Sequence, residues 1–180
     1  MAGIIAYTDK VSHEWYAPAG INRGGLTRVI RAYDRLDRDD RDALYESRIN
    51  PIATFPDTGV VAWGQKTLQV KASALDRINV RRLLIKIKKT VASSTKYLLF
   101  EQSDEALWSK FKNIVNPVLT GILANAGISE FKVVMDETHN TPDVIDRNEV
   151  KGEIFIKPKK SAEFILLDFN IMAQSATFNN

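Results

Sequence analysis

Side chains suited to acid–base, nucleophilic or metal chemistry are sparse in this sequence. It contains two histidines, His13 and His139, and no cysteine. The lack of cysteine excludes disulfides, thiolate metal sites and cysteine nucleophiles. No Gly-rich phosphate loop, Ser-His-Asp arrangement or HExxH motif is present. We therefore expect a protein that is not an enzyme and that carries no cofactor.

One loop collects residue types that can bind metal ions. They are Asp136, Glu137, His139, Asp143 and Asp146. The loop lacks the glycine and the terminal glutamate of a calcium-binding loop. We interpret it as a solvated polar loop and predict no metal site.

The most basic helix is predicted from Asp76 to about Ser93. An apolar stripe along it is formed by Val80, Leu84, Ile87 and Val91. The opposite face carries Arg82, Lys86 and Lys89, with Arg81 and Lys88 beside them. Such a face could contact phosphates, yet it lacks the interleaved aromatic residues of single-strand binders. A solvated face and an acidic protein partner are both favoured over nucleic acid. A basic nucleic-acid-binding domain remains the alternative function.

Length and composition indicate one globular domain with a sizeable core. The chain has 180 residues, 44% of them hydrophobic, and a formal net charge of +3. That charge permits an acidic partner without selecting one. No run of 18 apolar residues and no secretion signal occurs, so we expect no membrane insertion. The chain opens on core-type residues with no polar lead-in, which favours a piece of a longer protein.

The order of predicted elements defines an α+β fold. A helix is expected over 34–48, then a hairpin of strands 49–55 and 59–64, the basic helix, and a second long helix. That second helix has Ser103 as N-cap, contains Pro117 and stops at Gly127. Further strands are predicted over 26–33, 97–100, 131–135, 150–157 and 163–172. We expect a mostly antiparallel sheet packed against two long helices.

The last predicted strand, Glu163 to Met172, has apolar residues on both faces. It fits either a central strand of its own sheet or a strand that pairs with another subunit. The residues alone leave both possibilities open.

A series of short motifs runs in order along the chain, at residues 17–24, 49–52, 59–67, 77–83, 100–101, 107–108, 140–142 and 158–163. Together they resemble the C-terminal part of contractile phage tail sheath proteins. Each is weak alone, but their order is specific, and the resemblance extends from about Ala2 to Phe178.

The resemblance implies a structural subunit of a contractile tail sheath. Sheath subunits stack as hexameric rings around an inner tail tube, and contraction drives that tube through the host envelope. The implied partners are other sheath subunits, the inner tail tube protein, and the baseplate and tail terminator proteins. The implied location is the virion tail, assembled in the host bacterial cytoplasm.

The resemblance also assigns parts of the chain. Residues 1–160 correspond to the inner domain of a longer subunit, because family members usually carry a large N-terminal portion. Residues 161–180 correspond to a C-terminal strand and arm that adds to a neighbour. The inter-subunit strand residues are Phe164, Ile165, Leu166, Leu167, Phe169 and Ile171. Candidate contacts to the tube or a neighbour are Arg82, Lys86, Lys89, Lys110 and Lys112. Such contacts should be polar and modest, since contraction must break them.

Overall fold

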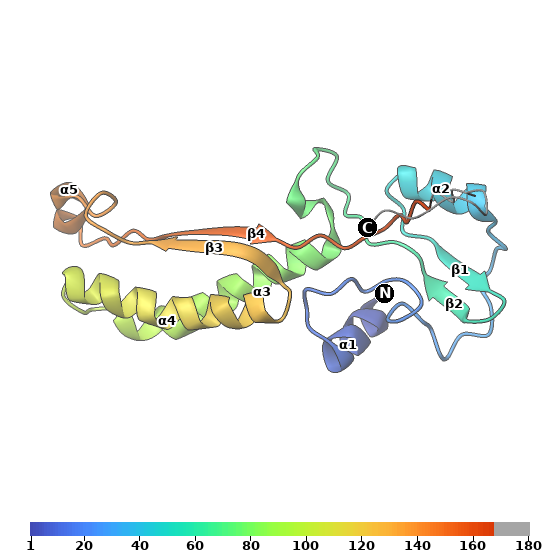
Figure 1. Cartoon of the computed structure of the whole chain (residues 1–180), viewed down its shortest axis with the longest axis horizontal. Coiled ribbons are helices and arrows are strands. Elements are labelled where there is room, and N and C mark those ends of the chain that lie inside the picture. Colours follow the sequence, from blue (N-terminus) through green and yellow to red (C-terminus); the bar gives the residue numbers. More distant parts are fainter. Residues whose placement is uncertain (168–180) are drawn as a thin grey trace, which may run out of the picture.

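The computed structural model describes residues 1–167 and has an elongated shape with two ends (Figure 1). One end, the helical end, contains α3, α4, α5, β3 and β4. The other, the hairpin end, contains α1, α2, β1 and β2. After β4 the chain crosses from the helical end towards α2. The segment that follows β4 therefore lies between the two ends.

The helical end is built from two antiparallel helices under a two-stranded sheet. Its elements are η1 (Ala74–Asp76), α3 (Ile78–Thr95), η2 (Lys96–Leu98), α4 (Glu105–Ala124), β3 (Ile128–Val134), α5 (Pro142–Asp146) and β4 (Glu153–Pro158). β3 and β4 pair antiparallel, with a register irregularity between Ile128 and Glu130. Buried residues of α3, α4 and β3 form one apolar cluster: Leu83, Ile87, Val115, Leu119, Ile122 and Ile128. This cluster fixes the helices against the sheet.

Helix α4 begins at a side-chain cap. The Asp104 carboxylate accepts a hydrogen bond from the Leu107 backbone N–H at 2.8 Å, which satisfies one of the free donors of the first turn. The cap is thus Asp104 and not the predicted Ser103, one residue earlier. Pro117 lies inside the helix, as predicted.

The hairpin end is smaller and less helical. Its elements are α1 (Ala2–Val11), α2 (Arg38–Glu46), β1 (Ile52–Phe55) and β2 (Gly59–Ala62). β1 and β2 form the predicted hairpin, with Ala53 opposite Val61. A loop covers the outer edge of β2: the Ala62 N–H donates to Gly24 O at 2.9 Å, and Leu26 N–H donates to Val60 O at 2.8 Å. No residue of α2 is buried, so this end relies on few apolar contacts.

The α+β class is confirmed, but the sheet differs from the prediction. Residues 1–167 contain two separate two-stranded antiparallel sheets instead of one larger sheet. The hairpin therefore does not extend the sheet of the helical end.

Two predicted strands are wrong. Residues 26–33 form turns and bends, and the side chains of Ile30 and Tyr33 are fully exposed. Apolar and polar residues alternate here, but no residue of 26–33 is buried, so the alternation does not reflect a strand with one face in the core. Residues 97–100 lie in and after η2, where the chain reverses between two antiparallel helices. A run of four residues with helices on both sides has no partner strand within reach.

The predicted strand over 163–172 is only partly described. Residues 163–167 have no regular secondary structure. The remainder, including Phe169 and Ile171, lies outside the described residues. Among the helices of residues 1–167, none has the length and apolarity needed to cross a membrane.

Candidate functional site

Two cations of the basic stripe on α3 hold another part of the same chain. An Arg82 guanidinium nitrogen donates to the Asp9 carboxylate at 2.6 Å, and a second nitrogen donates to Glu14 O at 3.1 Å. Lys86 Nζ lies 2.6 Å from Glu14 Oε1. The hydrogen bond from Lys86 lowers the pKa of Glu14 despite partial burial. Arg82 and Lys86 therefore fasten segment 9–14 onto α3.

The three other basic candidates make fewer or weaker contacts within the described part of the chain, which leaves them more available to a partner. Lys89 is exposed and Lys112 is half-buried, and neither forms an ion pair with any other residue of 1–167. Lys110 lies 3.2 Å from Glu101 in an exposed pair, which contributes little to stability. Arg82, Lys86 and Lys89 lie on α3, whereas Lys110 and Lys112 lie on α4. The five residues thus come from two elements and have different surroundings.

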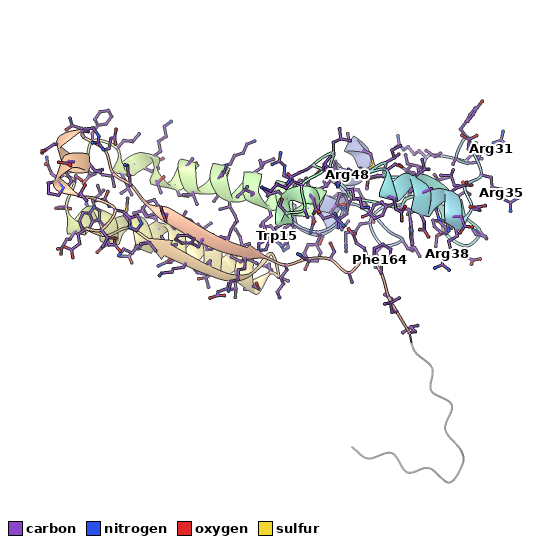
Figure 2. All side chains as sticks on the ribbon, turned by 90° about the horizontal axis from the view of Figure 1, so that it is seen from above. Trp15, Arg31, Arg35, Arg38, Arg48 and Phe164 are labelled. Atoms are coloured by element: carbon purple, nitrogen blue, oxygen red, sulfur yellow. The ribbon has the colours of Figure 1, made fainter. Side chains whose placement is uncertain are left out.

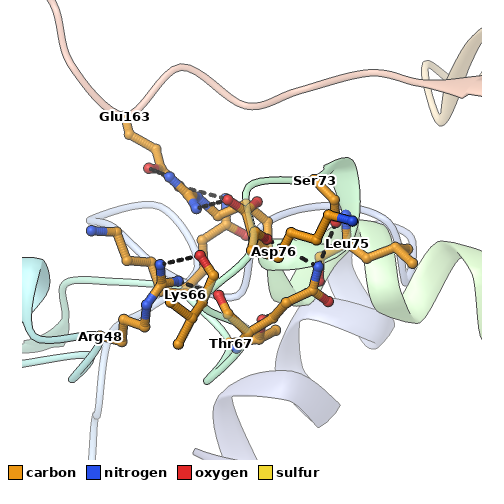
Figure 3. Close-up of polar contacts among 12 residues, drawn as sticks. Arg48, Lys66, Thr67, Ser73, Leu75, Asp76 and Glu163 are labelled. Carbon is orange, nitrogen blue, oxygen red and sulfur yellow. Dashed lines mark hydrogen bonds and ion pairs between the residues drawn. The ribbon is translucent and has the colours of Figure 1, made fainter.

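The segment that follows β4 is fixed to the body by three side chains, which we call the anchor: Gln65, Arg77 and Glu163. Arg77 binds the Glu163 carboxylate with two nitrogens, at 2.7 and 2.9 Å. Gln65 Nε2 donates to Glu163 at 3.2 Å and to Ser161 Oγ at 2.7 Å. Figure 3 shows Glu163 reaching the polar cluster that contains Asp76 and Lys66. A two-nitrogen arginine–carboxylate contact is strong and directional.

The anchor stands at the junction between the two ends of the molecule. Backbone bonds join the chain after β2 to the start of α3: Thr67 N–H donates to Asp76 O at 2.9 Å, and Ile78 N–H donates to Gln65 O at 2.8 Å. Arg48 adds a hydrogen bond to Val70 O at 2.9 Å (Figure 3). The anchor residues Gln65 and Arg77 therefore sit on a well-bonded backbone.

Burial and charge act together on the anchor. Desolvation by itself raises the pKa of Glu163, but the hydrogen bonds from Arg77, Tyr45 and Gln65, together with the charge of Arg77, outweigh it and leave that pKa below its usual value. The Glu163 contact raises the pKa of Arg77. Burial, followed by the Glu163 carboxylate, raises the pKa of Tyr45. Both anchor charges are thus stabilised in their ionised forms.

Two hollows flank the anchored segment. One, of about 230 Å³, is lined by Ala17, Ala19, Tyr45, Trp63, Gln65 and Phe164, among others. The second, of about 580 Å³, is lined by Ser73, Asp76, Arg77, Asn79, Lys160 and Phe164, among others. Gln65 Oε1 and Asn79 Oδ1 are buried and make no hydrogen bond with other residues of 1–167. The segment therefore lies between open spaces and is held by few contacts.

Beyond Glu163 the chain leaves the body. Figure 2 shows it extending away from the molecule after Phe164. The predicted strand residues Phe164, Ile165, Leu166 and Leu167 are 73%, 79%, 92% and 69% exposed. Four consecutive large apolar side chains in water are unfavourable, and exposed apolar patches are typical of surfaces that bind partners.

The sequence interpretation did not single out the anchor. Gln65, Arg77 and Glu163 each lie within one of the motifs that carry the family resemblance, at 59–67, 77–83 and 158–163. These motifs are distant in sequence, and each contributes one polar side chain. That combination is the signal that could have indicated a contact among the three residues.

The acidic loop around His139 is a local hydrogen-bond cluster. His139 Nδ1 lies 3.0 Å from Asp136 Oδ1, and Thr138 also donates to Asp136. The hydrogen bonds from His139 and then Thr138 lower the pKa of Asp136 to about 2. Within residues 1–167 no three His, Asp or Glu side chains are grouped so that they could hold a metal ion.

The fold is that of sheath-type chains of contractile injection machines. A chain in the cryo-EM structure of the anti-feeding prophage baseplate matches with a TM-score of 0.85 and 22% identity, over 96% of this chain and 49% of that one. A chain in the contracted sheath complex of an extracellular contractile injection system matches with a TM-score of 0.86 and 22% identity, over 94% of this chain and 49% of that one.

Sequence relatives identify the family within this fold. The tail sheath protein of Vibrio phage KVP40 is 47% identical over 178 residues, and that of Enterobacteria phage T4 is 41% identical over 179. The family model for the phage tail sheath C-terminal domain matches residues 70–172. This chain belongs to the phage tail sheath C-terminal domain family, as the motifs predicted. It covers 26% and 27% of the length of those two relatives, with 99% of its own residues aligned.

Proposed function

We propose that this chain is the inner domain of a contractile tail sheath subunit and acts as a structural, non-enzymatic part. The observation that carries the proposal is the 47% identity to a tail sheath protein over 99% of the chain. Residues 1–160 form the domain body, and residues 161–180 form the C-terminal strand and arm. The subunit assembles with other sheath subunits around an inner tail tube in the virion, between baseplate and terminator proteins. Contraction of that assembly drives the tube through the host envelope.

The arm serves as a strand that pairs with a neighbouring subunit. Its exposed residues Phe164 to Leu167 lose their unfavourable contact with water once a neighbour covers them. We infer that β1 offers the acceptor edge: within residues 1–167 its backbone groups make no backbone–backbone hydrogen bond outside the hairpin. The one bond that reaches it there from outside goes to a side chain, from Ala32 N–H to Thr54 Oγ1 at 3.1 Å. Strand addition to such an edge satisfies backbone groups on both partners.

The tube contact is a small set of lysines on α3 and α4. Lys89, Lys110 and Lys112 suit a polar contact that can break on contraction. Arg82 and Lys86 are less suited because Asp9 and Glu14 already neutralise them. The same internal pairing removes two cations from any nucleic-acid surface, which weakens that alternative.

Charge reversal tests the tube contact. Lys89→Glu with Lys112→Glu should abolish co-sedimentation with purified tubes, whereas Lys132→Glu, an exposed lysine on β3, should leave it unchanged. Normal co-sedimentation of the double variant would remove these residues from the tube contact.

Electron microscopy of the complete subunit tests the sheath function itself. We expect striated cylinders with a helical repeat, which a polymerising sheath must form. Dispersed particles at all concentrations and ionic strengths would contradict the proposal.

A further inference from the structure

The chain between β4 and the arm is attached at few points. β4 ends at Pro158. Lys159 N–H donates to Gly127 O at 3.1 Å. The next attachments are Ser161 and Glu163, through Gln65 and Arg77. Beyond Glu163, the side chains of residues 164–167 are exposed. The chain therefore leaves the body at Glu163 and not at the end of β4.

We propose that Arg77, Gln65 and Glu163 form a releasable anchor that sets the free length of the C-terminal arm. This inference rests on the proposed role of the arm as an inter-subunit strand. With the anchor closed, the arm starts at residue 164. With the anchor open, residues 160–163 join the arm and add about 13 Å of reach, at roughly 3.3 Å per extended residue. The anchor residues thereby determine how far apart two subunits joined by the arm can lie.

The surroundings of Arg77 make release feasible. A third contact joins its guanidinium to Asp76 at 3.0 Å. When Glu163 departs, Arg77 keeps a carboxylate partner, so no uncompensated charge remains half-buried. Because Glu163 is only partly buried, its carboxylate regains water on release.

The packing around the segment also permits movement. The hollows of about 230 and 580 Å³ lie on its two sides, and Phe164 lines both. Gln65 is 3% exposed, yet its Oε1 is unpaired within residues 1–167. Moving a tightly packed strand would break buried apolar contacts. Residues 160–163 are held mainly by a small set of polar bonds, so those bonds determine whether the segment stays attached.

Limited trypsin digestion of the unassembled chain tests the anchor. The target is the Lys160–Ser161 bond, which the anchor holds against the body. Glu163→Gln and Arg77→Ala should each speed cleavage about tenfold, because a difference of about 1.4 kcal/mol corresponds to a tenfold change. Arg77→Lys should fall between, since lysine lacks the two-nitrogen fork. Arg81→Ala is the matched control, an exposed arginine one turn further along α3, and should cleave at the wild-type rate.

Wild-type cleavage rates in both Glu163→Gln and Arg77→Ala would overturn the anchor. Equal acceleration in Arg81→Ala would overturn it too, since the effect would then be general loosening of α3. Should Arg77→Ala fail to fold, Glu163→Gln decides alone, because it leaves α3 unchanged.

The change in reach can be measured by pulsed electron spin resonance. The chain has no cysteine of its own. Cysteines introduced at Lys88 on α3 and at Leu166 in the arm would therefore be the only positions that take a spin label. Glu163→Gln should broaden the distance distribution and extend it by up to about 13 Å. An unchanged distribution would contradict the release. Both measurements use unassembled chains, so they hold or fail independently of whether the arm joins a neighbour.

Discussion

The helical end and the hairpin end are stabilised in different ways. At the helical end, six large apolar side chains from α3, α4 and β3 form one buried cluster. At the hairpin end, the buried residues are mostly small, such as Ala53, Val60 and Ala62, and no residue of α2 is buried. There the backbone is joined by polar side chains, including Asn50, whose Nδ2 donates to Lys66 O and whose Oδ1 accepts from Lys66 N–H.

This difference fits two tasks of the proposed sheath domain. A cluster of apolar side chains gives a rigid body, since buried hydrophobic area is costly to expose. A region joined by hydrogen bonds can exchange partners at lower cost, because each bond contributes modestly to net stability. The anchor lies at the junction of the two ends and β1 lies at the hairpin end, and it is there that exchange with a neighbour is proposed.

The largest expected effect is at the helical end. Leu119→Ala should lower the free energy of unfolding by about 2–5 kcal/mol, because Leu119 is fully buried and its loss leaves a cavity. Leu123→Ala, on the same helix but 38% exposed, is the control and should cost less than half as much. Urea denaturation measures both. Equal losses would mean that the apolar cluster does not dominate this end.

A steric effect follows at the hairpin end, from two adjacent glycines. A Cβ at Gly24 would lie 2.7 Å from Ala62 O and 2.7 Å from Gly20 O, both backbone atoms, whereas a Cβ at Gly25 meets nothing within 4 Å. Gly24→Ala should therefore cost about 1–3 kcal/mol, and Gly25→Ala about 0.5 kcal/mol or less. Thermal unfolding compares them. If the two variants melt together, the loop does not pack on β2 as described.

A smaller effect is expected from the polar bonds of the hairpin end. Asn50→Ala removes bonds of 2.9 and 2.8 Å to Lys66 and should cost about 1 kcal/mol. Hydrogen exchange should speed up in β1 and β2 while α4 keeps its protection. Asn113→Ala, exposed on α4, should change neither region. Faster exchange throughout the molecule in Asn50→Ala would show that the two ends unfold as one unit.

The smallest effect is a pH dependence of the anchor. The folded pKa of Glu163 lies below its usual value of 4.5, so its stabilising contribution is present above about pH 4.5 and is lost as pH falls through the lowered pKa. Amide NMR signals of residues 161–163 should shift in that acid range. Glu163→Gln should abolish the shift. If the signals in Glu163→Gln shift with pH as they do in the wild type, the shift arises from a group other than Glu163.

The sequence predicted most of the helical end and less of the remainder. The apolar stripes of α3 and α4 repeat with helical spacing, so periodicity identified them directly. The hairpin was found through the turn before Gly59, whose φ of 75° suits glycine. The strand expected at 97–100 failed because four residues carry too little periodic signal to separate a strand from a turn.

The site was harder to predict than the fold. The helical spacing of Arg82 and Lys86 correctly indicates a polar face of α3. It does not reveal that their partners are Asp9 and Glu14, about 70 residues earlier in the chain. The Arg77–Glu163 contact spans 86 residues. Pairings of this kind depend on how distant segments pack, which local spacing does not encode.

The most direct test of the central proposal places a photo-crosslinker in the arm. Benzoylphenylalanine at Leu166, in sheaths assembled from a mixture of light and heavy isotope-labelled complete subunits, should give cross-linked peptides that pair light with heavy chains. Mass spectrometry should locate the partner at or near β1. The same group at Lys132, exposed on β3, is the control for random capture. Cross-links confined to single chains, or equal capture from both positions, would contradict an arm that joins one sheath subunit to the next.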